Sequence, residues 1–200
     1  MRPVVRLQSP APQGAIDHAA YLARGGYRLL KRCIAGEIES DMVLQSVGDS
    51  GLHGVHEPAA VEWERVHGAP TPRAMEVSAA AAGPAGLADR ALLEGNPHRC
   101  FEGMLIAAWA VGASRIRLLV RGGPAALRAM LAAELLKLRD RRPYPGMPEI
   151  VLRFDDAPPS DDGLPTLRQR IETLYWVPDI LERGAAWFAS QAQCRRWAGA

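Results

Sequence analysis

The chain has 200 residues, a formal net charge of +2 and 48% hydrophobic residues. This length and composition exclude a largely disordered chain and are typical of one domain with a sizeable core. The near balance of 24 basic and 22 acidic residues gives no reason to expect nucleic-acid binding. The cysteines, Cys33, Cys100 and Cys194, lie too far apart to predict a disulfide framework or a cysteine-ligated metal or iron–sulfur site.

Nothing in the sequence predicts secretion or direct membrane insertion. Residues 1–6 lack the apolar run of a signal peptide. The longest apolar run, Met104–Ala113, is too short to cross a bilayer. Together with the cysteine usage, these features predict a cytoplasmic protein.

The N-terminal quarter predicts an arm followed by a helical lead-in. Residues 1–14 contain proline, glutamine and glycine and are expected to form an extended arm. The lead-in covers about 15–50, with Gly25-Gly26 ending its first helix and Ser40 expected as the N-cap of its third. Its helices are predicted over residues 16–24, 27–34 and 41–47.

The next segment is the hardest to interpret. Residues 53–73 hold histidines and prolines without a periodic pattern, and 67–73 indicate a loop. A short strand is expected over 74–77. The small residues of 78–86 indicate a linker.

The centre of the chain predicts an α/β fold. Asn96 and Pro97 are expected to cap a helix that ends at Gly112, and an acidic, proline-rich loop is expected over 155–163. Alternating helices and strands are the pattern of a βαβ unit with a parallel sheet. Helices are predicted over 98–111, 125–139, 165–176 and 178–197, and strands over 115–121 and 149–154.

Four short blocks, collinear over residues 16–190, carry a family resemblance. They are Tyr21-Leu22-Ala23-Arg24-Gly25-Gly26-Tyr27 with Ser50-Gly51-Leu52; Asp89-Arg90, Asn96-Pro97-His98 and Phe101-Glu102-Gly103-Met104; Ala110-Val111-Gly112-Ala113 with Val120-Arg121-Gly122; and Ile171-Glu172-Thr173-Leu174 with Val177-Pro178, Ile180-Leu181, Arg183-Gly184-Ala185 and Trp187-Phe188-Ala189. The chain resembles the NADH- and FMN-binding flavoprotein subunit of respiratory complex I and its relatives in NAD-linked hydrogenases and formate dehydrogenases.

The resemblance implies a Rossmann-like FMN-domain core with a parallel sheet, an N-terminal helical lead-in and a C-terminal helix. We expect one such domain over 15–200. The ubiquitin-like SLBB domain and the iron–sulfur domain of the family are expected to be absent.

The flavin-phosphate loop that the resemblance implies is degenerate. The family continues Ser-Gly-Leu with a glycine-rich run, which lets backbone N–H groups approach a phosphate. Here only Gly51 and Gly54 remain, and residues 55–59 are Val-His-Glu-Pro-Ala. Where the family has a Lys-Trp pair, this chain has Glu62-Trp63. A carboxylate in place of the lysine opposes phosphate binding.

The other cofactor contacts implied by the resemblance are also missing. The family's acidic segment at the flavin and nicotinamide corresponds to 78–85, which has no carboxylate. The family's Asn-Asn pair corresponds to Gln169-Arg170, and its Gly- and Glu-rich segment before the last helix is nearly deleted. We therefore expect no catalytic residue and no bound cofactor, with Gly51 and Gly54 the remnant of the FMN loop.

These losses favour a non-catalytic paralogue that acts as a structural or regulatory component of a redox enzyme complex. Expected partners are protein subunits, first a thioredoxin-like iron–sulfur subunit, or a second copy of the chain. One alternative is a flavin- or nucleotide-binding component of an NADH-linked oxidoreductase, with FMN as cofactor. Another is a small-molecule sensor that uses the vacated pocket. Whether the N–H groups of Gly51 and Gly54 still point to a common position discriminates between these hypotheses.

Aromatic residues near the C-terminus are the candidates for a partner surface. Trp187, Phe188 and Trp197 lie on the last predicted helix, and tryptophan is enriched at interfaces.

Other reactive side chains have simpler interpretations. His53, His56 and His67 would form a metal set with Glu57 or Glu62, but a solvated loop is the better interpretation, and no metal is expected. Asp155, Asp156, Asp161 and Asp162 are interpreted as a solvated loop too, and Cys100 as a buried thiol rather than a reactive thiolate.

Overall fold

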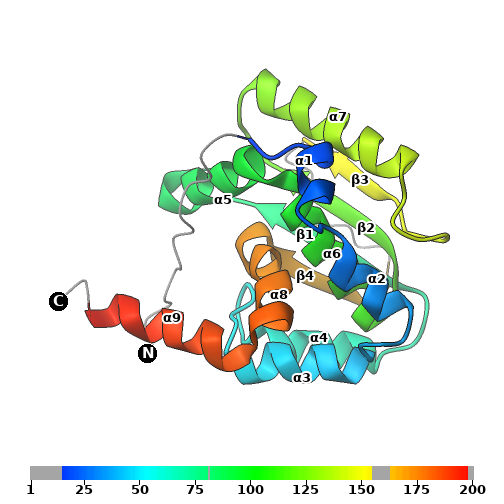
Figure 1. Ribbon diagram of the computed structural model, residues 1–200, viewed down its shortest axis with the longest axis vertical. Coiled ribbons are helices and arrows are strands. Elements are labelled where there is room, and N and C mark those ends of the chain that lie inside the picture. The colour runs from blue at the N-terminus through cyan, green and yellow to red at the C-terminus, as the bar shows by residue number, and fades with distance from the viewer. Residues whose placement is uncertain (1–14, 81, 155–162, 198–200) are drawn as a thin grey trace.

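The computed structural model describes residues 15–80, 82–154 and 163–197, and it has an α/β architecture (Figure 1). The expected arm over 1–14 and the four aspartates of the acidic loop lie outside these residues. In chain order the elements are α1 His18–Ala23, α2 Arg28–Ile34, α3 Ser40–Ser50, α4 Ala59–His67, β1 Arg73–Ala79, α5 Gly83–Gly95, α6 Pro97–Val111, β2 Ala113–Val120, α7 Ala125–Asp140, β3 Ile150–Arg153, β4 Thr166–Arg170, α8 Ile171–Arg183 and α9 Ala185–Trp197.

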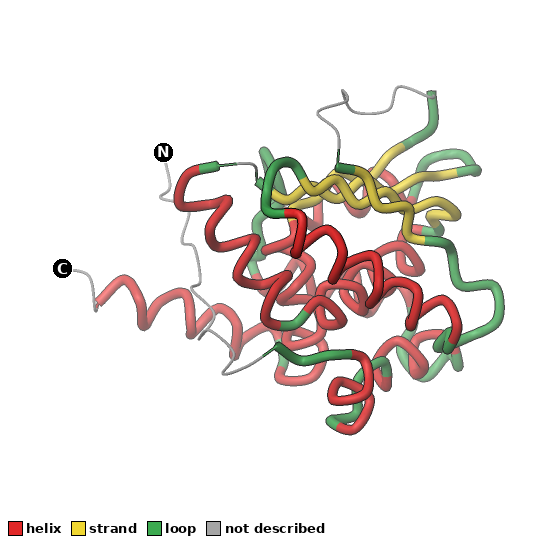
Figure 2. The backbone as a smooth tube through the Cα atoms, turned by 90° about the horizontal axis from the view of Figure 1, so that it is seen from above, coloured by secondary structure: helices red, strands yellow, loops and turns green. Residues whose placement is uncertain are grey.

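The described strands form one parallel sheet in the order β3-β2-β1-β4. The chain runs from β1 outward to β2 and β3 and then returns to β4 on the other side of β1. Most helices gather on one side of this sheet (Figure 2). The predicted α/β class with a parallel, Rossmann-like sheet is confirmed, and the strand order reverses between β1 and β4, where open α/β sheets commonly bind ligands.

Helix α6 is the centre of the core. Its N-terminus is capped as predicted, since the Asn96 side chain accepts a hydrogen bond of 3.1 Å from the N–H of Arg99. Gly112 ends the helix in the left-handed region at φ 68°. Nearly every side chain between these ends is buried, which fits a helix that packs against the sheet and against α8. Cys100 is fully buried here and burial raises the pKa of its thiol, so the inert interpretation of this cysteine is supported.

A buried polar network ties the lead-in to α6 and α7. Glu102 accepts hydrogen bonds from the hydroxyl of Tyr21 at 2.5 Å, the N–H of Tyr27 at 2.9 Å and the N–H of Leu30 at 3.3 Å. Tyr27 has φ 61°, a left-handed conformation that is uncommon for a non-glycine residue. The contact with Glu102 therefore holds the turn between α1 and α2 on the surface of α6.

His98 extends this network to α7. Its Nδ1 lies 2.7 Å from the Tyr27 hydroxyl and its Nε2 lies 2.8 Å from a carboxylate oxygen of Glu134. The same oxygen of Glu134 accepts the N–H of His18, and Lys137 pairs with the other oxygen at 2.7 Å. Despite the carboxylate, burial lowers the pKa of His98 to about 4.

The lowered pKa of His98 predicts that the folded protein loses stability in mild acid. The unfolded chain takes up a proton on His98 near pH 6.5, whereas the folded chain does so only near pH 4, so stability falls as the pH falls through this interval. The loss amounts to about 3 kcal/mol at most. Urea denaturation between pH 7 and pH 4 should show it. His98→Gln should flatten this pH dependence, whereas His56→Gln, which changes an exposed histidine, should retain it. Equal slopes in both variants would contradict the assignment.

Two predicted segments are wrong. The segment 78–86 is not a linker, because β1 extends to Ala79 and α5 begins at Gly83 with a proline in its first turn. The helix predicted over 165–176 is divided, because residues 166–170 form β4 and pair with β1. In both cases contacts with β1 or with neighbouring helices outweigh the local pattern.

Smaller differences concern helix ends and the segment left unassigned. Residues 59–67 form α4, with Trp63 and Val66 buried on its inner side. Ser40 is the first residue of α3 rather than its N-cap, and Glu39 occupies the cap position. Helix α8 runs through Pro178 to Arg183, so the helix predicted over 178–197 is divided at Gly184 between α8 and α9.

Candidate functional site

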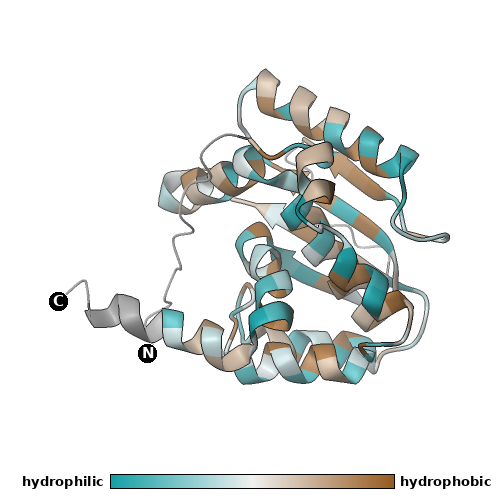
Figure 3. Cartoon of the chain, viewed as in Figure 1, coloured by the Kyte–Doolittle hydropathy of each residue, from teal (hydrophilic) through white to brown (hydrophobic). Residues whose placement is uncertain are grey.

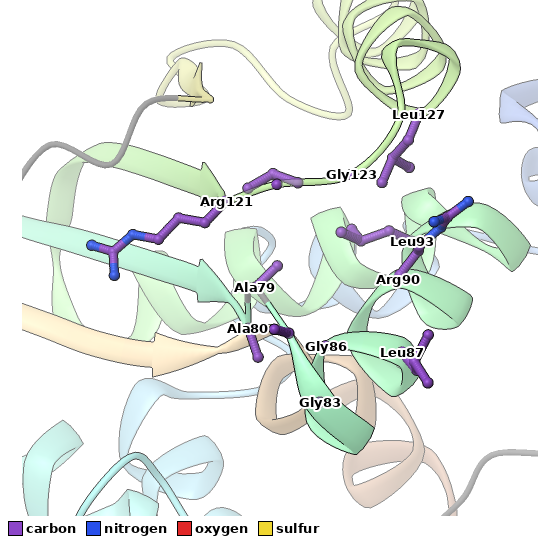
Figure 4. A pocket seen from close by; sticks show the side chains of 13 residues that line it. Ala79, Ala80, Gly83, Gly86, Leu87, Arg90, Leu93, Arg121, Gly123 and Leu127 are labelled. Carbon is purple, nitrogen blue, oxygen red and sulfur yellow. The ribbon is translucent and has the colours of Figure 1, made fainter.

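A pocket opens at the carboxyl ends of β1 and β2 (Figure 4). It is a small, open cavity of about 120 Å³ beside the first turns of α5 and α7. The resemblance aligns the family's acidic cofactor segment with this place. Its lining is small and apolar, with Arg90 and Arg121 as the charged members, and Arg90 pairs with Glu94 at 2.7 Å. The described residues that line it are Ala79, Ala80, Ala82, Gly83, Gly86, Leu87, Arg90, Leu93, Val120, Arg121, Gly122, Gly123 and Leu127.

Among the described residues that line the pocket there is no acid–base pair and no nucleophile. Figure 4 shows Ala79, Leu93 and Leu127 around the space, and the Arg121 side chain directed away from it. The structure thus places the carboxylate-free segment where the family resemblance predicts that a cofactor would be oriented, at the carboxyl edge of the sheet.

The remnant glycines use their N–H groups within their own loop. The N–H of Gly51 donates to the carbonyl of Gly48 at 3.1 Å, and Gly51 closes α3 with φ 66°. The N–H of Gly54 donates to the carbonyl of Glu57 at 2.9 Å. The two groups therefore do not point to a common ligand position, in contrast to a phosphate-binding loop.

The side chains of Gln169 and Glu62 fill the space beside this loop. A Cβ atom added to Gly54 would lie 3.2 Å from Nε2 of Gln169, so the glutamine amide is packed directly against the loop backbone. The same Nε2 donates to Glu62 at 2.8 Å, and the N–H of Arg168 donates to the other Glu62 oxygen at 2.9 Å. Glu62 on α4 and Gln169 on β4 thus bind each other, at two positions where the resemblance implies a difference from the family.

The rest of the loop is held from both sides. The hydroxyl of Thr173, in the first turn of α8, donates to the carbonyl of His53 at 2.9 Å. Leu52 of the loop and Trp63 of α4 are both buried. The loop is therefore anchored as part of the packed structure.

The electrostatics at the loop oppose an anion. Burial raises the pKa of Glu62, while the N–H of Arg168 and the guanidinium of Arg65 act in the opposite direction. A phosphate dianion brought to this position would meet the Glu62 carboxylate and the carbonyls that accept the glycine N–H groups. The residues present do not fit the phosphate of FMN at this loop.

The hydrogen bonds that Glu62 accepts are expected to stabilise the fold. Glu62→Ala would leave the N–H of Arg168 and the amide of Gln169 without their acceptor, at a cost of about 2–4 kcal/mol in the free energy of unfolding. Glu64→Ala, which removes an exposed carboxylate from the same helix, should change it by less than about 0.5 kcal/mol. Urea denaturation monitored by tryptophan fluorescence measures both. Equal effects would mean that the Glu62 pair carries no structural role.

His67 and His53, which were considered as metal ligands, form hydrogen bonds with different parts of the chain. His67 donates from Nδ1 to the carbonyl of Ala110 at 2.8 Å, and His53 is bound through its backbone. Glu57 lies 3.6 Å from Arg65. Among the residues that the structure describes, no three histidine, cysteine, aspartate or glutamate side chains come together as a metal site.

The aromatic interface candidates differ in their surroundings. Phe188 is buried, and its ring centroid lies 5.8 Å from that of Trp176, so it belongs to the core between α8 and α9. Trp187 is half-buried, and the guanidinium of Arg183 lies 4.6 Å from its ring centroid. The side chain of Trp197 lies outside the described part of the chain. Helix α9 extends away from the body of the domain (Figure 1).

The chain is similar to part of several known proteins. No protein-family model matches the chain. The second NADH-quinone oxidoreductase F subunit of Rhizobium meliloti (strain 1021) is 27% identical over 233 aligned positions, which cover 93% of this chain and 53% of the relative. The F subunit of Aquifex aeolicus (strain VF5) is 29% identical over 105 positions, 51% of this chain and 24% of the relative. A chain in the crystal structure of NAD⁺-reducing [NiFe]-hydrogenase superposes with a TM-score of 0.61 at 28% identity, covering 74% of this chain and 31% of that chain.

The chain is therefore a homologue of the NADH-quinone oxidoreductase F subunit and of the corresponding chain of NAD⁺-reducing [NiFe]-hydrogenase. The resemblance found in the sequence is confirmed. The chain spans about half the length of the R. meliloti relative. No helix among the described residues is long and apolar enough to cross a membrane.

Proposed function

We propose that this protein is a non-catalytic, structural or regulatory component of an NADH-linked redox enzyme complex. Its homologues are subunits of multi-subunit redox complexes, which supports protein partners in general. The named partner that the resemblance favours is a thioredoxin-like iron–sulfur subunit, and the proposed location is the cytoplasm.

The contact between Glu62 and Gln169 is the observation that carries the proposal. Both positions differ from the family pattern, and the new side chains bind each other at 2.8 Å against the remnant glycine loop. Independent changes at two positions would not be expected to create a buried hydrogen bond between them, although Oε1 of Gln169 is buried here without a hydrogen-bond partner. The pair supports a site that was rebuilt for stability after cofactor binding was lost.

The alternative function is a flavin- or nucleotide-binding component of an NADH-linked oxidoreductase. One observation favours it, since the pocket at the carboxyl ends of β1 and β2 is still open beside the first turns of α5 and α7. A flavin there would have to bind its phosphate without the loop of Gly51 and Gly54. The same pocket is the place for the sensor hypothesis.

The proposal is tested by affinity purification of the chain at native levels, followed by mass spectrometry. We expect subunits of a redox complex to co-purify. Trp187→Ala should weaken the association, because this half-buried ring lies on the helix that extends from the domain. Leu87→Ala, at a side chain that is 70% exposed on α5, should leave it unchanged. Recovery of the chain without any redox-complex subunit would contradict the proposal.

A further inference from the structure

Strand β3 leaves one edge of the sheet unpaired within the described chain. It pairs with β2 on one side, and it is the last strand in the order β3-β2-β1-β4. Edge strands are commonly protected by proline, lysine or a covering segment, because their free N–H and C=O groups pair readily with another strand. The sequence of β3 is Ile-Val-Leu-Arg, and Figure 3 shows the strand as largely hydrophobic below α7.

Apolar side chains are exposed on α7 and on the opposite face of β3. Leu136 is 49% exposed on α7. Val151 is 45% exposed and points away from α7, since Ile150 and Leu152 alternate with it and line the groove beside α7. Between the two elements runs an open groove of about 860 Å³, whose apolar lining includes Leu135, Leu152 and Phe154. A strand edge and an adjoining apolar helix face together form a surface suited to a protein partner.

The charged residues on either side of Val151 are placed so that two antiparallel copies of β3 can pair them with opposite charges. Glu149 and Arg153, both exposed, lie two residues before and two residues after Val151. When two copies of this strand pair in antiparallel fashion about a twofold axis at Val151, Glu149 of each copy lies opposite Arg153 of the other. Ile150 then lies opposite Leu152, and Val151 opposite itself. Directly opposed residues in such a pair have Cβ atoms ~5 Å apart, and opposite charges there stabilise it.

We propose that β3 and the adjoining face of α7 form a homodimer interface, in which two copies pair through β3 in antiparallel register centred on Val151. A twofold axis perpendicular to the sheet keeps both α7 helices on the same face. Leu136 of each copy then covers the groove of the other, and the parallel sheets join into one. The interface is isologous, as in most symmetric dimers.

Charge exchange tests this register. Multi-angle light scattering should give a mass twice the chain mass of 21.7 kDa for the wild-type protein. In the proposed dimer residue 149 lies opposite residue 153 twice. Either single variant, Glu149→Arg or Arg153→Glu, therefore places like charges opposite each other at both positions. Each variant should raise the dimer dissociation constant at least tenfold. The double variant E149R/R153E should restore dimerisation. Glu64→Arg, the same change on α4, should have no effect.

Disulfide trapping gives a second readout at the axis. Val151→Cys, in a Cys194→Ser background, should form an inter-chain disulfide under mild oxidation, since the two copies of residue 151 are opposed. Val61→Cys, at a side chain that is 48% exposed on α4, should not. A monomeric wild-type protein, a dimer insensitive to the single charge reversals, or a double variant that stays monomeric would overturn the proposal. None of these readouts depends on whether a redox-complex subunit co-purifies.

Discussion

Gly103→Ala is expected to lower the free energy of unfolding by about 3 kcal/mol or more. Gly103 lies in the middle of α6, where this helix meets α8, and a Cβ atom there would overlap the backbone carbonyl of Leu174. A side chain could rotate out of the way, but a carbonyl inside a helix cannot move without shifting the whole helix. Since α8 also follows β4 directly, the shift would disturb the edge of the sheet.

Chemical denaturation followed by circular dichroism measures this loss. Gly48→Ala is the matched control, because Gly48 also lies in a helix and its added Cβ would meet only the Cβ of Ala60, at an ordinary 3.5 Å. We expect that variant to equal or exceed the wild type by up to about 1 kcal/mol, since alanine is the better helix former. Similar stability of both variants would show that α6 and α8 are not packed as described.

Glu102→Ala is expected to cost about 3–5 kcal/mol. The substitution leaves three buried donors without an acceptor, namely the Tyr21 hydroxyl and the N–H groups of Tyr27 and Leu30. It also releases the left-handed Tyr27, so the turn between α1 and α2 should loosen. Hydrogen exchange should therefore rise in the lead-in before the sheet is affected.

The control for this substitution is Glu94→Ala. Glu94 forms an exposed ion pair with Arg90 at 2.7 Å, and such pairs contribute up to about 1 kcal/mol. Denaturation midpoints and exchange rates of the two variants are compared at the same pH. If Glu102→Ala were as stable as Glu94→Ala, the buried network would not anchor the lead-in.

The residues of these two contacts lie in the sequence blocks that carry the family resemblance. Glu102 and Gly103 belong to the block Phe101-Glu102-Gly103-Met104, and Tyr21 and Tyr27 belong to the first block. In the structure these residues contact one another or the backbone of α8. These parts of the sequence resemblance therefore rest on residues that pack the scaffold.

The sequence predicted the bounds of helices whose capping residues can be recognised locally. Asn96 with Pro97 marked the start of α6, and Gly112 marked its end. Strand β4 carries no such signal, since its polar sequence Thr-Leu-Arg-Gln-Arg becomes a strand by pairing with β1. The small residues that begin α5 resembled a linker because their helical conformation depends on packing against α8 and α6.

The candidate site was predictable only in part. The carboxylate of Glu62 and the scarcity of glycines after Ser50-Gly51-Leu52 could be seen in the sequence. The contact of Glu62 with Gln169 could not, because the two residues are 107 positions apart and the register of β4 brings them together. The network of His98 and Glu134 was missed for the same reason, although His98 lay within a recognised block.

We propose that the loop of Gly51 and Gly54 does not bind FMN. The most direct test is the visible absorption spectrum of the freshly purified protein, before and after incubation with FMN and gel filtration. We predict no flavin band in the protein peak in either case, because the N–H groups of Gly51 and Gly54 are bonded within the loop and Glu62 lies beside it. A stoichiometric flavin band that co-elutes with the protein would contradict the account and return this loop to a cofactor site.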